Sequence, residues 1–452
     1  MIPARGRSAA DVLAELRARQ RDDVDWRRGR VFSLVYHASD EHEQLIKDAH
    51  ALYASANLLN PMAFKGLRSL EKDIVDAAAA LFNGPRAVGA VTSGGTESIL
   101  CAVAAYRDRA RRKKPWILWP ELVVPRTIHP AFDKAAHYFG VKLVKVGVDR
   151  DQRADVRAMA KAIGWRTIGL VASAPQYPHG VIDPIAEIGE LAVHHRVPFH
   201  VDACVGGFVL PWLERMGRSL PRWDFRVRGV TSISADLHKF AYAGKGASLL
   251  LWRSLDDFRD QIFVATDFPG GIYASPTLLG TRPGGPIAAA WAALHAMGEA
   301  GYLDATARAI DAADRLRAGI AQIPGLSLLG RPDATIVAYT GEHLFAVADR
   351  LEARGWSVDR QHRPTSVHLT VTANHAPIVD EYLADLRASV GEVRANPALA
   401  KSGSAPMYGM AAKLPLRRLV AKNVRKMIAE LYSSSERPAS GDGARVASEK
   451  NT

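Results

Sequence analysis

The sequence has little cysteine and no long hydrophobic run. Its 452 residues include only two cysteines, Cys101 and Cys204, and both lie within apolar stretches. This pattern excludes a disulfide framework and fits a reducing compartment. No run approaches the roughly 18 apolar residues of a membrane-spanning helix, and the N-terminus lacks the apolar core of a secretory signal. We therefore expect a soluble, cytoplasmic protein, although secretion into a host stays open.

Motifs of several other functional classes are also missing. His194, His195 and His200 are accompanied by neither HExxH nor a Cys/His pattern, so we expect no metal site. Neither a Walker A loop nor GxGxxG is present, so nucleotide binding is not indicated.

The net charge is +12, of which residues 1–30 and 411–452 contribute +8. No basic motif is interleaved with aromatics, so nucleic-acid binding has no support. The basic ends are either solvated tails or attract anionic substrates or membrane surfaces.

Hydrophobic residues make up 48% of the chain, which is enough for a large core. The first part of the sequence has the periodicity of helices. An amphipathic pattern opened by Ser8 predicts a helix over residues 8–21, followed by helices over about 41–55 and about 67–82. The last of these ends at an Asn-Gly-Pro turn.

Between the third helix and about residue 265, short apolar runs alternate with helical stretches. The runs include ILWP, VKLVKV, TIGLVAS, PFHVDA and ASLLLW. This alternation predicts a mainly parallel sheet covered by helices. A long helix begins near Pro286, and a smaller strand and helix pattern follows. We therefore predict an α/β protein with an N-terminal helical segment (1–58), a large domain (59–300), a small C-terminal α/β domain (301–432) and a disordered tail (433–452).

The string SGGTES, residues 93–98, connects a strand-like run to an apolar helix. Glycines at such a turn let backbone N–H groups approach an anion, and the helix N-terminus adds the positive end of its dipole. The hydroxyl groups of Ser93, Thr96 and Ser98 add donors. The string therefore predicts an anion site, with a glycine-rich connection capped by Thr96 as the alternative.

Two further strings supply a carboxylate and an amine. In HVDACVGGF, Asp202 follows an apolar run, and ligand-facing groups collect at the carboxyl ends of parallel strands. Its carboxylate suits a protonated heteroaromatic nitrogen, but it also suits a cap on the following turn. In TSISADLHKFAYAGKG, Lys239 follows His238 after a strand-like run. Such an amine suits imine formation with an aldehyde, although most lysines are solvated surface charges.

Three other segments carry polar side chains where functional loops are expected. His129 precedes a helix, so it either caps that helix or stacks on a flat ligand. SAPQYPHGVIDP begins at Ser173, and GGIYASPTLLGTRPGG contains Thr281. Both of these strings are also consistent with tight turns.

Taken in order, these strings resemble pyridoxal-phosphate enzymes of the aspartate-aminotransferase fold. Within the group II decarboxylases they are very similar to the sphingosine-1-phosphate lyase family, over roughly residues 30–432. The resemblance implies fold type I, with a mainly parallel seven-stranded sheet in a large domain and a smaller C-terminal α/β domain. It implies pyridoxal 5'-phosphate as cofactor. The implied activity is retro-aldol cleavage of long-chain base 1-phosphates to a long-chain aldehyde and phosphoethanolamine.

The resemblance also implies roles for residues. Lys239 would hold the cofactor as an imine, Asp202 would pair with its ring nitrogen, and His129 would stack on the ring. The other cofactor contacts would come from Gly94, Gly95, Thr96, Ser173, Ser234, His238 and Thr281. Thr281 would reach in from the second subunit of a homodimer with shared active sites. The substrate phosphate would contact Tyr36, Asn60, Lys245 and Tyr408. Tyr36 and Lys245 would also act in catalysis, and the general base stays open among Lys239, Lys245 and a substrate phosphate oxygen.

The sequence departs from the family in two respects. Asn60, in NPMAF, stands where the family commonly has a histidine, so it brings no charge to the substrate phosphate. The membrane anchor of the eukaryotic enzymes is missing, which indicates a soluble, bacterial-type form. Two other functions stay open: an amino-acid decarboxylase that uses the same cofactor, and a non-catalytic binding or membrane-surface protein that kept the fold.

Overall fold

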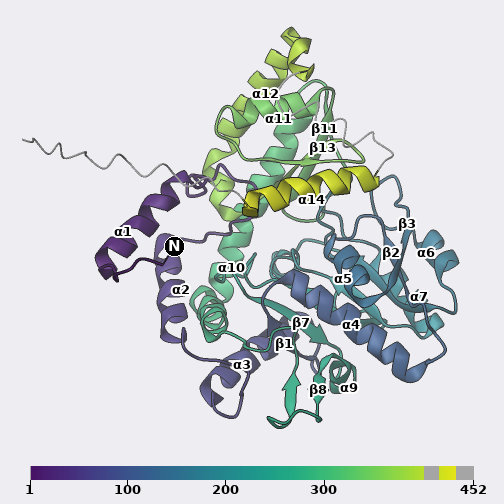
Figure 1. Ribbon diagram of the computed structural model, residues 1–452. Coiled ribbons are helices and arrows are strands. Elements are labelled where there is room, and N and C mark those ends of the chain that lie inside the picture. Colours follow the sequence, from purple (N-terminus) through teal and green to yellow (C-terminus); the bar gives the residue numbers. More distant parts are fainter. Residues whose placement is uncertain (1, 402–416, 434–452) are drawn as a thin grey trace, which may run out of the picture.

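The computed structural model describes residues 2–401 and 417–433 (Figure 1). The helices are α1 (Ala9–Arg19), α2 (Asp40–Leu52), α3 (Lys65–Leu81), α4 (Gly95–Lys113), α5 (Ala131–Phe139), α6 (Val156–Ala162), α7 (Ile185–His195), α8 (Leu210–Arg215), α9 (Leu255–Phe258), α10 (Gly284–Ala321), α11 (Leu344–Glu352), α12 (Val379–Ala395) and α14 (Arg417–Ser433). The strands are β1 (Val88–Thr92), β2 (Glu121–Pro125), β3 (Lys142–Val146), β4 (Thr167–Ser173), β5 (Phe199–Asp202), β6 (Val230–Ala235), β7 (Ser248–Trp252), β8 (Phe263–Ala265), β9 (Tyr273–Ser275), β10 (Leu326–Leu328), β11 (Ile336–Gly341), β12 (Asp359–Gln361) and β13 (Ser366–Thr370).

The first three helices form where the sequence predicts them. Ser8 caps α1, because its hydroxyl oxygen accepts a hydrogen bond from the backbone N–H of Asp11 at 3.1 Å. Ser39 caps α2 through the N–H of His42 in the same way. After α3 the chain reverses at Asn83, whose φ of 55° is in the left-handed region that ends a helix.

The central sheet has the strand order β1-β7-β6-β5-β4-β2-β3. The strands from β6 to β3 are parallel to their neighbours, whereas β7 pairs antiparallel with both β1 and β6. β4 is buried along its whole length, as its apolar run TIGLVAS requires of a strand covered on both faces. Lysines keep the edge strand β3 polar. The predicted mainly parallel seven-stranded sheet is confirmed.

One predicted strand is wrong. ILWP, residues 117–120, forms an irregular loop, and the strand is the next segment, β2. β2 opens with the buried Glu121, whose carboxylate pairs with Lys142 and Arg166. Because its first residue is a charged glutamate whose partners are distant in sequence, a hydrophobicity pattern does not predict that the strand begins there. In the apolar loop before it, Ile117 is buried, whereas Leu118 and Trp119 remain exposed, with 67% of Trp119 accessible.

A second sheet, with the antiparallel order β10-β11-β13-β12, forms the smaller C-terminal α/β part. Helix α10 packs on α2 and α3 at one end and on β10 and β11 at the other, so it joins the two parts (Figure 1). It is interrupted at Gly298, where φ is 54°. The domain boundary predicted after residue 300 lies beside this break, and the division into domains stays a prediction. Within the described ranges, no helix is both long and apolar enough to span a bilayer.

Candidate active site

A cavity of about 720 Å³ opens at the carboxyl ends of β4, β5 and β6, where the first turn of α4 faces the segment after β6. Ligands bind at this edge of parallel sheets because loops and helix N-termini converge there. Nine of the predicted site residues line the cavity: Tyr36, Gly94, Gly95, Thr96, His129, Asp202, His238, Lys239 and Lys245.

Lys239 lies against a carboxylate that the sequence analysis did not select. Its Nζ is 2.8 Å from Oδ2 of Asp236, which is only 3% exposed. Burial alone lowers the pKa of Lys239, but the charge of Asp236 outweighs it, so the pKa of Lys239 is raised above its usual value. The same pair holds the pKa of Asp236 below its usual value in spite of burial. The amine is therefore held as an ammonium ion next to a fixed counter-ion.

Asp202, at the end of β5, is held by neighbours that fix its orientation. Its Oδ1 accepts hydrogen bonds from the backbone N–H of Cys204 at 3.1 Å and from the hydroxyl of Ser234 at 3.3 Å. Ser234 in turn contacts Nε2 of the buried His200 at 3.1 Å. The structure thus places Ser234 behind the carboxylate, where it orients Asp202 without lining the cavity.

The first turn of α4 forms the opposite wall and suits an anion. Gly95 is required there, since a Cβ at this position would lie 2.7 Å from both Oδ1 of Asp236 and Sγ of Cys204. His238 faces Gly94 across the cavity. Among the residues that the structure describes, buried Nδ1 of His238 and Oδ1 of Asp236 find no hydrogen-bond partner. Buried polar atoms rarely stay unpaired, so both indicate a polar ligand that bonds here.

His129 and Tyr36 add two rings to the cavity. Nδ1 of His129 accepts a hydrogen bond from the N–H of Ala131 at 3.2 Å, which fixes the ring and leaves the proton on Nε2. Tyr36 packs edge-on against Phe240, and burial raises the pKa of its phenol to about 12. The phenol therefore stays protonated and can donate a hydrogen bond near neutral pH.

Lys245 is the second amine of the cavity. Its Nζ lies 5.2 Å from the centre of the Tyr36 ring and donates to the backbone oxygens of Leu34 at 2.6 Å and His238 at 3.3 Å. Partial desolvation at the cavity mouth and the positive charge of Lys239 lower the pKa of Lys245 to about 8, although the residue as a whole is exposed. Of the two amines, this one titrates close to neutral pH.

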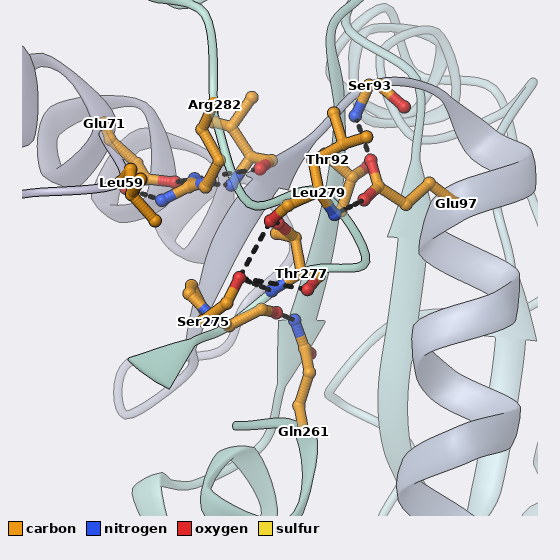
Figure 2. Close-up of polar contacts among 12 residues, drawn as sticks. Leu59, Glu71, Thr92, Ser93, Glu97, Gln261, Ser275, Thr277, Leu279 and Arg282 are labelled. Atoms are coloured by element: carbon orange, nitrogen blue, oxygen red, sulfur yellow. Dashed lines mark hydrogen bonds and ion pairs between the residues drawn. The ribbon is translucent and has the colours of Figure 1, made fainter. Parts of the chain in front are cut away.

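Figure 2 shows how the loop between β9 and α10 supports the anion-binding turn. The carboxylate of Glu97 accepts hydrogen bonds from the N–H groups of Ser93 at 2.6 Å and Leu278 at 2.9 Å. Arg282 forms an ion pair with Glu71 and donates to the carbonyl of Val91 at 3.0 Å. Both contacts fasten the loop to the strand and helix that carry SGGTES.

Three other predicted site residues, Ser173, Thr281 and Asn60, do not line the cavity of this single chain. Ser173 is buried at the end of β4, with its backbone bonded to Asp183. Thr281 is exposed on the loop between β9 and α10, and Asn60 is exposed with its Oδ1 accepting hydrogen bonds from two backbone N–H groups of its own turn. Tyr408 lies outside the described residues. The roles of these residues stay predictions.

Besides Asp236, the sequence analysis missed a contact between the two parts of the fold. The hydroxyl of Tyr177, which lines the cavity, donates to Asp359 on β12 at 2.8 Å. The two residues are 182 positions apart, so no local pattern reveals the pair. Asp236 could have been selected from the sequence, because an acidic residue three positions before a candidate lysine can pair with its amine.

Compared with known families, the chain matches the pyridoxal-dependent decarboxylase conserved domain over residues 24–340. It is 43% identical to sphingosine-1-phosphate lyase 1 of Rattus norvegicus, over 96% of this chain and 77% of the rat protein. It is 42% identical to the sphingosine-1-phosphate lyase of Arabidopsis thaliana, over 93% of this chain and 79% of the plant protein.

Among solved structures, the chain resembles the sphingosine-1-phosphate lyase of Burkholderia pseudomallei, with a TM-score of 0.88 and 35% identity over 96% of this chain and 97% of that one. It also resembles glutamate decarboxylase of Lactobacillus brevis, with a TM-score of 0.76 over 87% of this chain and 94% of that one. The second match has 20% identity, so it supports the fold alone.

Proposed function

This chain belongs to the sphingosine-1-phosphate lyases within the pyridoxal-dependent decarboxylase family, and we propose on that premise that it cleaves long-chain base 1-phosphates. The observation that carries the proposal is one cavity in which Lys239, Asp202 and His129 meet, in a chain that agrees with these lyases along almost its whole length. The products are a long-chain aldehyde and phosphoethanolamine.

The residues of the cavity fit pyridoxal phosphate. The amine of Lys239 suits the aldehyde, the first turn of α4 with His238 suits the phosphate, and Asp202 suits the ring nitrogen. The unpartnered Nδ1 of His238 provides a buried polar atom for that phosphate. When bound, the cofactor accepts the electron pair that the breaking carbon–carbon bond leaves on C2 of the substrate.

The chain itself binds, orients and moves protons. Asp202, oriented by Ser234 and Cys204, would keep the ring nitrogen protonated through a charge-assisted hydrogen bond. His129, which lines the cavity, would cover one face of the ring. Lys245 and Tyr36 receive the substrate phosphate, since an ammonium group and a protonated phenol both donate to phosphate oxygens. Lys239 and Lys245 both line the cavity. A free amine there would accept the proton of the C3 hydroxyl, and an ammonium group would return a proton to C2.

We further propose that two copies share their sites. Asn60 and Thr281 lie on segments that are joined by a hydrogen bond from the N–H of Leu58 to the carbonyl of Arg282 at 2.9 Å. Both are exposed, and large apolar side chains are exposed nearby on the β8–β9 hairpin. A second chain packed on this surface would bury these side chains and would receive Thr281 at its own cavity. Light scattering should then give twice the mass of one chain.

The experiment that tests the reaction is incubation of the protein, loaded with pyridoxal phosphate, with sphingosine 1-phosphate. Mass spectrometry should detect a long-chain aldehyde and phosphoethanolamine in equal amounts. A parallel assay for carbon dioxide from glutamate and aromatic amino acids tests the decarboxylase alternative. Carbon dioxide without aldehyde would overturn the proposal. A colourless protein that turns over neither substrate would indicate the non-catalytic alternative.

We propose a reducing compartment such as the cytoplasm for this reaction. The support is that Cys101 and Cys204 are both free and buried. Burial also raises the pKa of the Cys204 thiol well above its usual value, so it stays protonated in the cavity wall.

A further inference from the structure

An exposed apolar surface lies far from the cavity. Trp116, Leu118 and Trp119, in the loop between α4 and β2, are 65%, 71% and 67% exposed, and Trp165, in the turn before β4, is 67% exposed. We call these four residues the tryptophan patch. Apolar side chains of this size are normally buried, and a cluster of them on a surface marks an interaction site.

The two segments of the patch are held next to each other by the central sheet. β2 and β4 are parallel neighbours, and Glu121 pairs with Thr167 where both strands begin. The N–H of Glu121 donates to the carbonyl of Arg166 at 2.9 Å, and the carboxylate of Glu121 lies 2.8 Å from the guanidinium of Arg166. Trp119 and Trp165 each precede these paired residues by two positions, so they belong to one surface.

Cations surround the patch. α4 ends in the string RDRARRKK, residues 107–114, directly before the loop. Next to it is a hollow of about 320 Å³ whose lining includes Arg109, Lys113, Lys114 and Arg196. The four arginines of the string form ion pairs with Asp108, Asp257 and Asp260. Lys113, Lys114 and Arg196 form no ion pair with any other residue of the described ranges. The surface therefore combines unpaired positive charge with exposed indole rings.

We propose that the tryptophan patch and these cations dock the protein on a membrane that contains anionic lipids. Indole rings favour the interface between headgroups and acyl chains, and lysine and arginine are attracted to anionic headgroups. The hollow has the charge to receive a lipid phosphate. Leu118, the most exposed of the four, favours a lipid over nucleic acid, because an aliphatic side chain gains from an apolar layer and offers no ring for base stacking.

Docking here leaves the active site accessible. The patch lies where β2 and β4 begin, whereas the cavity lies at the carboxyl ends of β4, β5 and β6. The cavity mouth therefore does not face the membrane, and the patch anchors the protein without being the substrate entrance. The proposal does not depend on the proposed reaction, since it concerns attachment alone.

The test uses the full chain loaded with pyridoxal phosphate in sedimentation with vesicles. Vesicles of phosphatidylcholine with phosphatidylserine should carry the protein down, and vesicles of pure phosphatidylcholine should carry far less. Two variants probe the two parts of the surface: Trp116→Ser with Trp119→Ser, and Lys113→Glu with Lys114→Glu. Each should lower the partition coefficient on anionic vesicles by about tenfold or more.

The matched control makes the same charge change on another basic helix, with Lys422→Glu and Lys426→Glu on α14. It should leave most of the vesicle binding in place. All variants should keep the bound cofactor and their turnover of detergent-dispersed substrate, which shows that they are folded.

Four outcomes would overturn the proposal. The first is unchanged vesicle binding in either patch variant, and the second is loss of binding in the α14 control alone. The third is a change of oligomeric state in the patch variants by light scattering, which would assign the surface to a second copy of the chain. The fourth is tighter binding to a fluorescent single-stranded oligonucleotide than to anionic vesicles at the same ionic strength, which would assign it to nucleic acid.

Discussion

At the carboxyl ends of β4, β5 and β6 a buried carboxylate pairs with the amine of the cavity, whereas near the amino ends of β2 and β4 some cations of a basic string have no ion pair within the described residues. Lys239 faces Asp236 inside the cavity, but Lys113 and Lys114 face solvent. One helix, α4, contributes to both regions, because its first turn lines the cavity and its last residues end in the basic string.

The difference between the two ends follows from the free energy of keeping a charged side chain in a buried or an exposed position. A buried charge needs a partner or a ligand, so the cavity groups come as a set whose members fix each other. An exposed charge costs little to keep, so it can remain free for a partner that arrives later. The cavity end is therefore organised for a small ligand held inside, and the amino end for a large charged surface outside.

The largest expected effect comes from removing one lysine amine at each end of the sheet and comparing the two variants. Lys239→Ala removes the amine that the cofactor aldehyde needs, so turnover should fall by at least about a thousandfold. The visible absorbance band of covalently bound pyridoxal phosphate should disappear as well. Lys113→Ala, at the amino end, is the matched control and should keep both the band and the turnover. Full activity in Lys239→Ala would show that the wrong lysine has been assigned.

The next prediction concerns the counter-ion. Asp236→Asn removes the charge that keeps Lys239 protonated, and the remaining burial then lowers the pKa of Lys239. A larger share of the amine is free at a given pH, so pyridoxal phosphate should attach faster to cofactor-free protein near pH 8. The rate of appearance of the absorbance band, followed across pH, should move to lower pH.

Asp202→Asn is the control for that shift. Asp202 lines the same cavity but is not among the groups that raise the pKa of Lys239. Its substitution should slow turnover through the ring nitrogen and leave the pH dependence of attachment in place. Equal pH profiles in Asp236→Asn and the unchanged protein would mean that the ion pair does not control the amine.

A smaller effect is expected for Lys245. Its pKa is lowered to about 8, so it carries a charge below that pH and loses it above. Attraction for the substrate phosphate should weaken as the pH rises through 8, and KM should increase several-fold between pH 7 and 9. Lys245→Arg keeps its charge over this range, so its KM should stay level. A parallel rise in both proteins would assign the titration to another group.

The sequence was sufficient for most of the cavity because its residues stand directly after strands. Asp202 ends β5, and SGGTES follows β1, so a correct strand assignment already places both at one edge of the sheet. The same reasoning failed for ILWP, since hydrophobicity alone does not distinguish a buried strand from an exposed apolar loop. The buried strand β2 begins instead with Glu121, whose charge is compensated by partners distant in sequence.

Contacts between distant segments were not predictable. Tyr177 and Asp359 meet only after the C-terminal sheet has packed beside the cavity, so neither residue stands out in its own string. Thr281 and Asn60 were chosen by resemblance, and a single chain does not bring them to the cavity. Reasoning from local pattern thus finds groups fixed by strand ends and misses those that depend on tertiary or quaternary packing.

The smallest expected effect tests whether the charges at the amino end serve stability. Arg111 lies 3.6 Å from Asp108, and both side chains are about half exposed or more. Arg111→Ala should therefore change the free energy of unfolding in urea by less than about 1 kcal/mol. Glu121→Gln, at the same edge but buried, should cost about 2 kcal/mol, because it weakens two charge-assisted contacts. A loss in Arg111→Ala as large as that in Glu121→Gln would mean that the basic string holds the fold together, and its charge would then need no membrane to explain it.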